Sequence, residues 1–127
     1  MTSETVSVRI PPEAGHVPLL RTTVAGVAAR MGFTLDEVDD LRMGVEEAAV
    51  LLLRQGGKNR ITLDLRLADD TIEASVEGDL TGEEPAVDRQ SFSWTILSAL
   101  VNDVWTEREG RSGRIVLVKK RSQDLPA

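Results

Sequence analysis

Residues 34–76, TLDEVDDLRMGVEEAAVLLLRQGGKNRITLDLRLADDTIEASV, decide the fold of this chain. Thr34 followed by Glu37 is the pattern of a capping box that opens a helix, and further acidic residues come where they favour the positive end of the helix dipole. Apolar residues then recur with the helical period until Gly56 and Gly57. This pattern predicts a helix over residues 34–55 whose C-terminal half is buried on more than one side.

The second half of the stretch alternates between apolar and polar residues, which is the period of a half-buried strand. The apolar positions are Ile61, Leu63, Leu65, Leu67, Ile72, Ala74 and Val76. Ala68-Asp69-Asp70 interrupts the alternation at the place of a tight turn. We therefore expect two antiparallel strands joined as a hairpin.

Further elements are predicted on both sides of this stretch. Residues 6–10 alternate like a strand, and residues 17–31 follow the helical period. Residues 78–90 have no period and predict a surface loop. Beyond the loop we expect a helix with Phe92, Ile96, Leu97 and Leu100 on its apolar side, strands at 104–108 and 114–120, and a disordered tail at 122–127.

This order of elements predicts an α+β fold. Three helices would cover one face of a mainly antiparallel five-stranded sheet and form a two-layer sandwich. The length of 127 residues and the 41% of hydrophobic residues suit one domain over residues 1–127.

The composition excludes several classes of function. Fifteen Lys and Arg against 21 Asp and Glu give a net charge of −6, and the basic residues do not cluster in the sequence, which argues against nucleic acid or an anionic membrane as a direct partner. The absence of cysteine and the single histidine, His16, exclude disulfides and cysteine or multi-histidine metal sites. Without a long apolar run or a signal-peptide pattern, we expect a cytoplasmic protein.

Four segments carry a resemblance to a known family. They are LLRTTVAGVAARMGF (19–33), LRMGVEEAAVLLLRQG (41–56), SFSWTILSALVNDV (91–104) and GRIVLVKK (113–120). In this order they resemble the anti-sigma-factor serine kinases of the GHKL superfamily, in the sigma-B/sigma-F class. The resemblance implies a histidine-kinase-like (Bergerat) ATPase fold in a dimeric protein. Such a protein sequesters an alternative sigma factor and is released by a STAS-type anti-anti-sigma partner, which active members phosphorylate on serine with ATP.

The resemblance also implies candidate site residues, and the chain departs from the family in each of the three motifs that contain them. In the family a Glu acts as general base, and an Asn four residues later ligates the Mg²⁺ of ATP; Glu47 matches the former, but Leu51 stands at the latter. Asp79 is a displaced match to the Asp that binds adenine. Ser91 and Ser93 stand where the family places a Gly-x-Gly that approaches phosphate.

These departures favour a chain that keeps the binding surface and has lost the nucleotide site. We expect Leu51 to fill the former pocket, no bound metal or cofactor, and Arg21 to face the sigma factor as the matching arginine does in the family. Glu46 is expected to pair with Arg42 on the helix surface. Two alternatives stay open: an active serine kinase that uses ATP and Mg²⁺, and a domain that binds another small ligand in the remodelled pocket.

Overall fold

The elements of the chain are given by a computed structural model that describes residues 4–56, 58–83 and 85–122. In order they are β1 (Glu4–Ile10), a short 3₁₀ turn (Ala14–His16), α1 (Val17–Arg30), α2 (Leu35–Arg54), β2 (Ile61–Ala68), β3 (Thr71–Asp79), α3 (Phe92–Leu100), β4 (Asp103–Glu109) and β5 (Ser112–Lys120). The predicted elements are confirmed, with strands that extend one to three residues further at an end than their alternation indicated.

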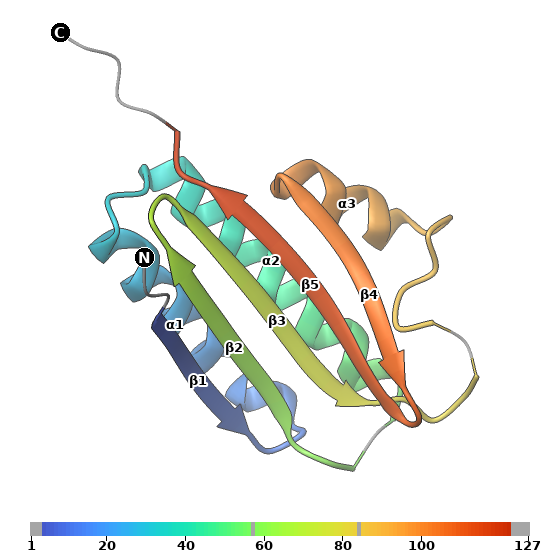
Figure 1. The fold of residues 1–127 in the computed structure, drawn as a ribbon. Coiled ribbons are helices and arrows are strands. Elements are labelled where there is room, and N and C mark those ends of the chain that lie inside the picture. Colours follow the sequence, from blue (N-terminus) through green and yellow to red (C-terminus); the bar gives the residue numbers. More distant parts are fainter. Residues whose placement is uncertain (1–3, 57, 84, 123–127) are drawn as a thin grey trace, which may run out of the picture.

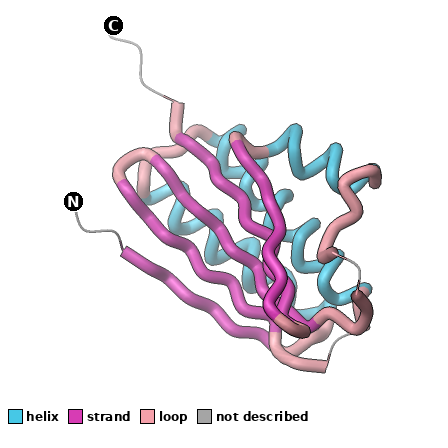
Figure 2. The backbone as a smooth tube through the Cα atoms, turned by 45° about the vertical axis from the view of Figure 1, so that its right-hand side comes forward, coloured by secondary structure: helices cyan, strands magenta, loops and turns pink. Residues whose placement is uncertain are grey.

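The strands form one antiparallel sheet in the order β1-β2-β3-β5-β4. All three helices lie on one face of this sheet, and the other face carries no helix (Figures 1 and 2). The predicted two-layer α+β sandwich is therefore confirmed. No helix in the described part of the chain combines the length and apolar content needed to cross a membrane.

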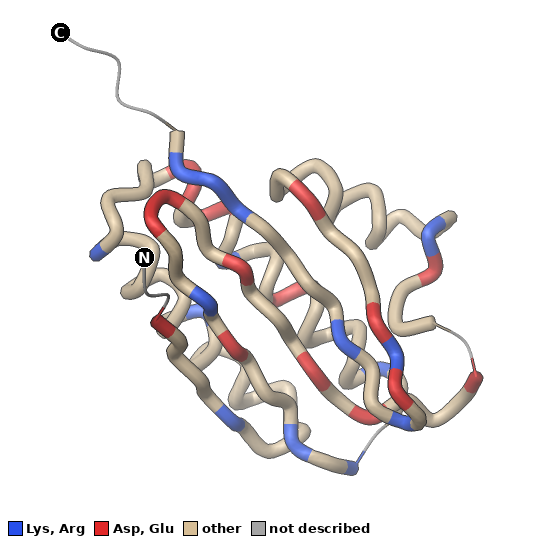
Figure 3. Tube along the Cα trace, in the orientation of Figure 1, with Lys and Arg blue, Asp and Glu red and all other residues tan. Residues whose placement is uncertain are grey.

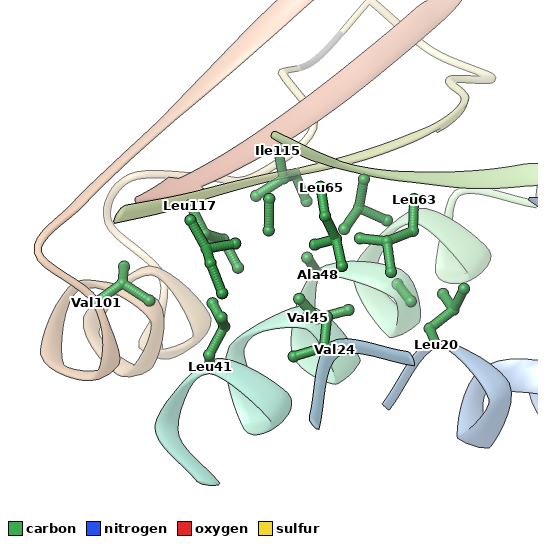
Figure 4. Close-up of a cluster of buried hydrophobic side chains, with 14 of the residues drawn as sticks. Leu20, Val24, Leu41, Val45, Ala48, Leu63, Leu65, Val101, Ile115 and Leu117 are labelled. Carbon is green, nitrogen blue, oxygen red and sulfur yellow. The ribbon is translucent and has the colours of Figure 1, made fainter. Parts of the chain in front are cut away.

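The core lies between the sheet and the helices, with α2 at its centre (Figure 4). Leu41, Val45 and Ala48 of α2 are completely buried against the sheet. Two glycines allow the close approach: a Cβ at Gly44 would lie 3.2 Å from Leu117 Cδ1, and a Cβ at Gly78 would lie 2.8 Å from Ile61 Cδ1. The middle helix therefore sits directly on β3 and β5.

The capping box of α2 also holds the end of β5. Glu37 Oε1 accepts a hydrogen bond from the Thr34 backbone N–H (2.8 Å), and Oε2 accepts one from the Ser122 backbone N–H (2.7 Å). Burial raises the pKa of Glu37, but these two hydrogen bonds outweigh it and keep the pKa below its ordinary value. Of the predicted tail, Ser122 is thus held in place, and residues 123–127 lie outside the described residues.

Two expectations about the segment before β4 are wrong. The loop after β3 is not wholly at the surface, because Leu80, Ala86 and Val87 are buried. Leu80 packs so closely on Gly113 that a Cβ there would lie 2.6 Å from it. Phe92, expected on the apolar side of α3, is 78% exposed because it is the first residue of the helix and precedes the turn that contacts the core.

We predict that Glu37→Gln lowers the free energy of unfolding at neutral pH and makes that free energy depend less on pH in the acid range. A carboxylate with a lowered folded pKa contributes stability above the ordinary glutamate pKa of about 4.3, and this contribution is lost as the pH falls through the lowered value. The gap between wild type and variant in urea unfolding should therefore narrow between about pH 6 and pH 3. Asp36→Asn, which removes the same charge from the same turn without those two hydrogen bonds, is the control; an equal narrowing for it would contradict the assignment.

Candidate functional site

A cleft opens between α2, the segment before α3 and the first turn of α3. Its volume is about 420 Å³. The lining residues are Leu51, Gln55, Pro85, Ala86, Val87, Asp88, Ser91 and Ser93. The structure therefore brings three of the residues singled out in the sequence, Leu51, Ser91 and Ser93, to one place.

Glu47, the candidate base, lies at this cleft through a direct contact with one of the serines. The Ser93 hydroxyl donates a hydrogen bond of 2.8 Å to Glu47 Oε1, and both side chains are half-buried. Ser93 is the second residue of α3, so this bond joins the first turn of α3 to the middle of α2. One of the two oxygens of the Glu47 carboxylate is thus bonded to a hydroxyl of the same chain.

Ser91 caps α3. Its hydroxyl accepts a hydrogen bond from the Trp94 backbone N–H (3.2 Å) and donates one to the Asp88 carbonyl oxygen (2.6 Å). A serine that satisfies one of the free N–H groups at a helix start is a common stabilising feature. Both serines therefore have structural roles within the chain. Two glycines at these positions would instead let a phosphate approach the backbone without meeting a side chain.

Leu51 lies one turn beyond Glu47 and lines the cleft without closing it. The expectation that it fills the former pocket is wrong, because about 420 Å³ remains open beside this half-buried side chain. A leucine carries no oxygen, and the hard cation Mg²⁺ needs oxygen ligands. Within the described residues no group of three or more His, Cys, Asp or Glu side chains could hold a metal ion. Position 51 therefore supplies no ligand to Mg²⁺.

Asp79 does not line the cleft. β3 continues as far as Asp79, which pairs with Ser112 of β5. Alternation along the strand places Asp79 on the same face as Ser75 and Glu77, while the helices cover the face of Val76 and Gly78. The expectation that Asp79 is a displaced adenine contact is therefore wrong for this geometry.

A second hollow lies between α1 and α2, on the side of α2 away from α3. It is lined by Arg21, Thr22, Ala25, Gly26, Arg42, Met43 and Glu46, and its volume is about 770 Å³. Arg21 forms an ion pair across the two helices with Glu46 at 3.3 Å. The predicted pair of Glu46 with Arg42 is wrong, because Arg42 bonds Asp39 at 2.8 Å. Arg21, the partner of Glu46, lies 25 residues away in sequence. Helical spacing predicts only pairs three or four residues apart, so it could not predict this one.

Gly26 and Met43 are features of this groove that the sequence reasoning missed. A Cβ at Gly26 would meet nothing within 4 Å, so the fold does not require a glycine there. A glycine inside a helix costs about 0.5–1 kcal/mol relative to alanine. Met43 is 47% exposed at the same groove. A glycine within the helical pattern of residues 17–31 is the sequence signal that could have pointed to this surface.

The chain is similar in sequence to proteins named RsbW. It is 32% identical over 109 residues to the anti-sigma-F factor RsbW of Mycobacterium tuberculosis, across 84% of this chain and 63% of that protein. It is 34% identical over 76 residues to the serine-protein kinase RsbW of Bacillus cereus, across 58% of this chain and 48% of that protein. These relatives, one named an anti-sigma factor and the other a serine-protein kinase, agree with the resemblance drawn from the sequence motifs.

The fold of the chain agrees with a solved structure. The RsbU and RsbW domains of Rv1364c from Mycobacterium tuberculosis match with a TM-score of 0.74 at 16% identity, over 95% of this chain and 33% of that one. The likeness establishes the GHKL-like fold. No protein-family model matches the sequence. The chain spans about half to two thirds of the length of the curated relatives it matches.

We predict that Ser93 and Glu47 are energetically coupled. In a double-mutant cycle of Ser93→Ala and Glu47→Ala, the coupling in urea unfolding at neutral pH should be about 1–2 kcal/mol, since the hydrogen bond involves a charged acceptor that is half-buried. Ser98→Ala, at an exposed position of the same helix, should give no coupling with Glu47. A coupling for Ser93 below about 0.3 kcal/mol would contradict the contact.

Proposed function

We propose that this chain is an anti-sigma factor that sequesters an alternative sigma factor of the sigma-F/sigma-B class by stoichiometric binding, and that an anti-anti-sigma partner releases it. One observation carries the non-catalytic part: the Glu47 carboxylate is bonded by Ser93 of the same chain, and Leu51 occupies the metal-ligand position. The name of the Mycobacterium tuberculosis relative, anti-sigma-F factor, supports the sigma-binding part.

The chemistry of phosphoryl transfer supports binding without catalysis. That reaction depends almost entirely on positioning and on neutralising charge with metal ions and backbone donors. A general base must also reach the proton that it removes. Here Glu47 already accepts from Ser93, and Leu51 supplies no metal ligand. The hydroxyl of Ser91 is used to cap α3 instead of leaving the backbone open to phosphate.

The groove between α1 and α2 is the surface that we assign to the sigma factor. Arg21 and Arg42 flank a floor in which Ala25 and Gly26 leave room for close approach. Arginine is enriched among residues that dominate binding energy, because its planar group forms several directed hydrogen bonds. Arg21 is 39% exposed despite its ion pair with Glu46, so its guanidinium can also reach a partner.

We further propose that residues 1–127 act as one domain in a cytoplasmic homodimer. β1 pairs with β2 on one side, and in the described part of the chain its other edge pairs with no strand. β1 is seven residues long and contains neither proline nor lysine, the residues that commonly protect an edge. Antiparallel pairing of this edge with a second copy would extend the sheet.

The second candidate is an ATP-dependent serine kinase that acts on an anti-anti-sigma protein. Two observations favour it: the cleft of about 420 Å³ remains open beside Glu47, and several relatives are named serine-protein kinases. Kinase activity would require Ser93 to release Glu47 and a metal to bind without a ligand from residue 51.

We predict that calorimetric titration with ATP gives no Mg²⁺-dependent binding at nucleotide concentrations up to about 1 mM, where ordinary nucleotide sites saturate. The Bacillus cereus RsbW protein, titrated under the same conditions, serves as the positive control. Tight Mg²⁺-dependent binding, together with phosphoryl transfer that Glu47→Ala abolishes, would establish the kinase alternative instead.

We predict that Arg21→Glu weakens binding of the cognate sigma factor by about tenfold or more, as expected for a central arginine contact. The alternative sigma factors of the host, purified singly, can be screened by surface plasmon resonance. Arg30→Glu makes the same charge change at the exposed end of α1 and should alter affinity by about twofold or less.

Gly26 provides a second variant that separates binding from folding. Gly26→Leu should block the groove while the fold tolerates it, because a Cβ there meets nothing within 4 Å. Unchanged affinity for both Arg21→Glu and Gly26→Leu would place the sigma factor on another surface.

A further inference from the structure

Three cations gather where β1 ends and β2 begins. Arg9 of β1, with Lys58 and Arg60 from the segment before β2, lines a hollow of about 450 Å³ together with Asn59, Thr62 and Glu77. Figure 3 shows the basic segments drawn together at this end of the sheet. The expectation that basic residues do not cluster is therefore wrong, since the register that sets Arg9 opposite Thr62 joins segments some fifty residues apart.

These cations have no anionic partner within the described residues. Among the described residues, no ion pair and no side-chain hydrogen bond includes Arg9, Lys58 or Arg60. The other arginines of the same sheet face are paired across strands, Arg66 with Glu73 at 3.7 Å and Arg114 with Glu107 at 3.3 Å. The positive charge of this cluster is therefore not balanced by ion pairs, whereas the other arginines on the same sheet face are paired with glutamates.

Glu77 is the carboxylate that lines the hollow, and it does not neutralise the cluster. The register places Arg9, Thr62 and Glu77 in one row across β1, β2 and β3. Among the ion pairs of the described residues, none joins Glu77 to Arg9, Lys58 or Arg60. Three cations and one carboxylate leave the hollow with an excess of positive charge on a chain whose net charge is −6.

Folding does not require this arrangement. Arg9, Lys58 and Arg60 are exposed, so they contribute little to the core. Like charges brought close together repel one another. A ligand that carries negative charge would remove this repulsion.

We propose that this hollow, defined by Arg9, Lys58, Asn59, Arg60, Thr62 and Glu77 and here called the basic hollow, binds an acidic segment of a protein partner. Arg9 and Arg60 can each bind a carboxylate through two parallel hydrogen bonds. Asn59 and Thr62 offer neutral groups to a peptide backbone, and Glu77 can accept from a backbone N–H. The site lies on the sheet side of the molecule, apart from the α1–α2 groove and the α2–α3 cleft, and so adds a surface to the proposed function.

A protein segment fits this site better than a nucleic acid. Affinity for duplex DNA rises with the number of phosphates neutralised, and three cations can engage only a few. The −6 charge of the whole chain repels a long polyanion, and Glu77 would face a phosphate directly. A short acidic peptide reaches the hollow without meeting the acidic remainder of the surface.

The test measures fluorescence anisotropy of a labelled peptide of about ten residues, alternating Glu and Gly, with the full chain at about 20 mM salt, where screening is weak. The site variant Arg9→Gln/Arg60→Gln should weaken binding by about tenfold, as expected for two lost charge-assisted contacts. The control Arg30→Gln/Arg111→Gln removes the same charge from two exposed positions outside the hollow and should stay within about twofold. Thermal unfolding of both variants verifies that they are folded.

Three results would overturn the proposal. Absence of binding to the wild-type chain would do so, as would an equal loss in site and control variants, which would mean attraction by overall charge. Tighter binding of a duplex DNA of about 20 base pairs than of the peptide, lost in the site variant, would assign the hollow to nucleic acid instead. None of these results bears on binding of the sigma factor, which Arg21→Glu tests separately.

Discussion

The close packing of α2 on strands β3 and β5 is the constraint on which the rest of the structure depends. Gly44 and Gly78 have no side chains where helix and sheet meet, and a Cβ at either would lie within 3.2 Å of a leucine or isoleucine methyl. Completely buried residues such as Leu41, Val45 and Ala48 then fill the contact at the density of a protein interior. One face of α2 is buried against the sheet. Its two remaining flanks face α1 and α3 and form the surfaces of the groove and the cleft.

The two flanks of α2 serve different purposes. On one flank Glu47, Leu51 and Gln55 follow one another at four-residue spacing toward α3 and the cleft. On the other flank Arg42 and Glu46 face α1 and the groove with Arg21. Because neighbouring residues on a helix point about 100° apart, the adjacent glutamates 46 and 47 belong to different sites. One helix can therefore contribute to two separate surfaces, and a substitution on one flank need not alter the other.

On the flank of α2 that faces α3, the residues at the candidate site make contacts within the chain or line the cleft. Ser93 bonds the Glu47 carboxylate, Ser91 caps α3 and Leu51 adds an apolar wall to the cleft. Ser91 and Ser93 each use a hydroxyl group within the chain, and Leu51 carries no polar group. In a kinase, the groups at these positions would contact the nucleotide or its metal. Sequestration needs a stable and complementary surface, and such replacements stabilise the domain that presents it.

Local patterns in the sequence determined the elements and their layers. The capping box at Thr34, the alternation over residues 61–76 and the helical period over residues 17–31 depend on neighbours along the chain, so they predict the α+β sandwich without coordinates. The motif positions of Glu47, Leu51, Ser91 and Ser93 were also readable there, and three of them do line the cleft.

Only the tertiary structure decided which distant residues meet. The bond between Ser93 and Glu47, the ion pair between Arg21 and Glu46, the removal of Asp79 from the cleft and the gathering of Arg9 with Lys58 and Arg60 join or separate residues far apart in sequence. Strand register and helix packing set these distances. A periodic pattern in the sequence predicts which face of its helix or strand a residue occupies. It does not predict which residue of a neighbouring element lies next to it.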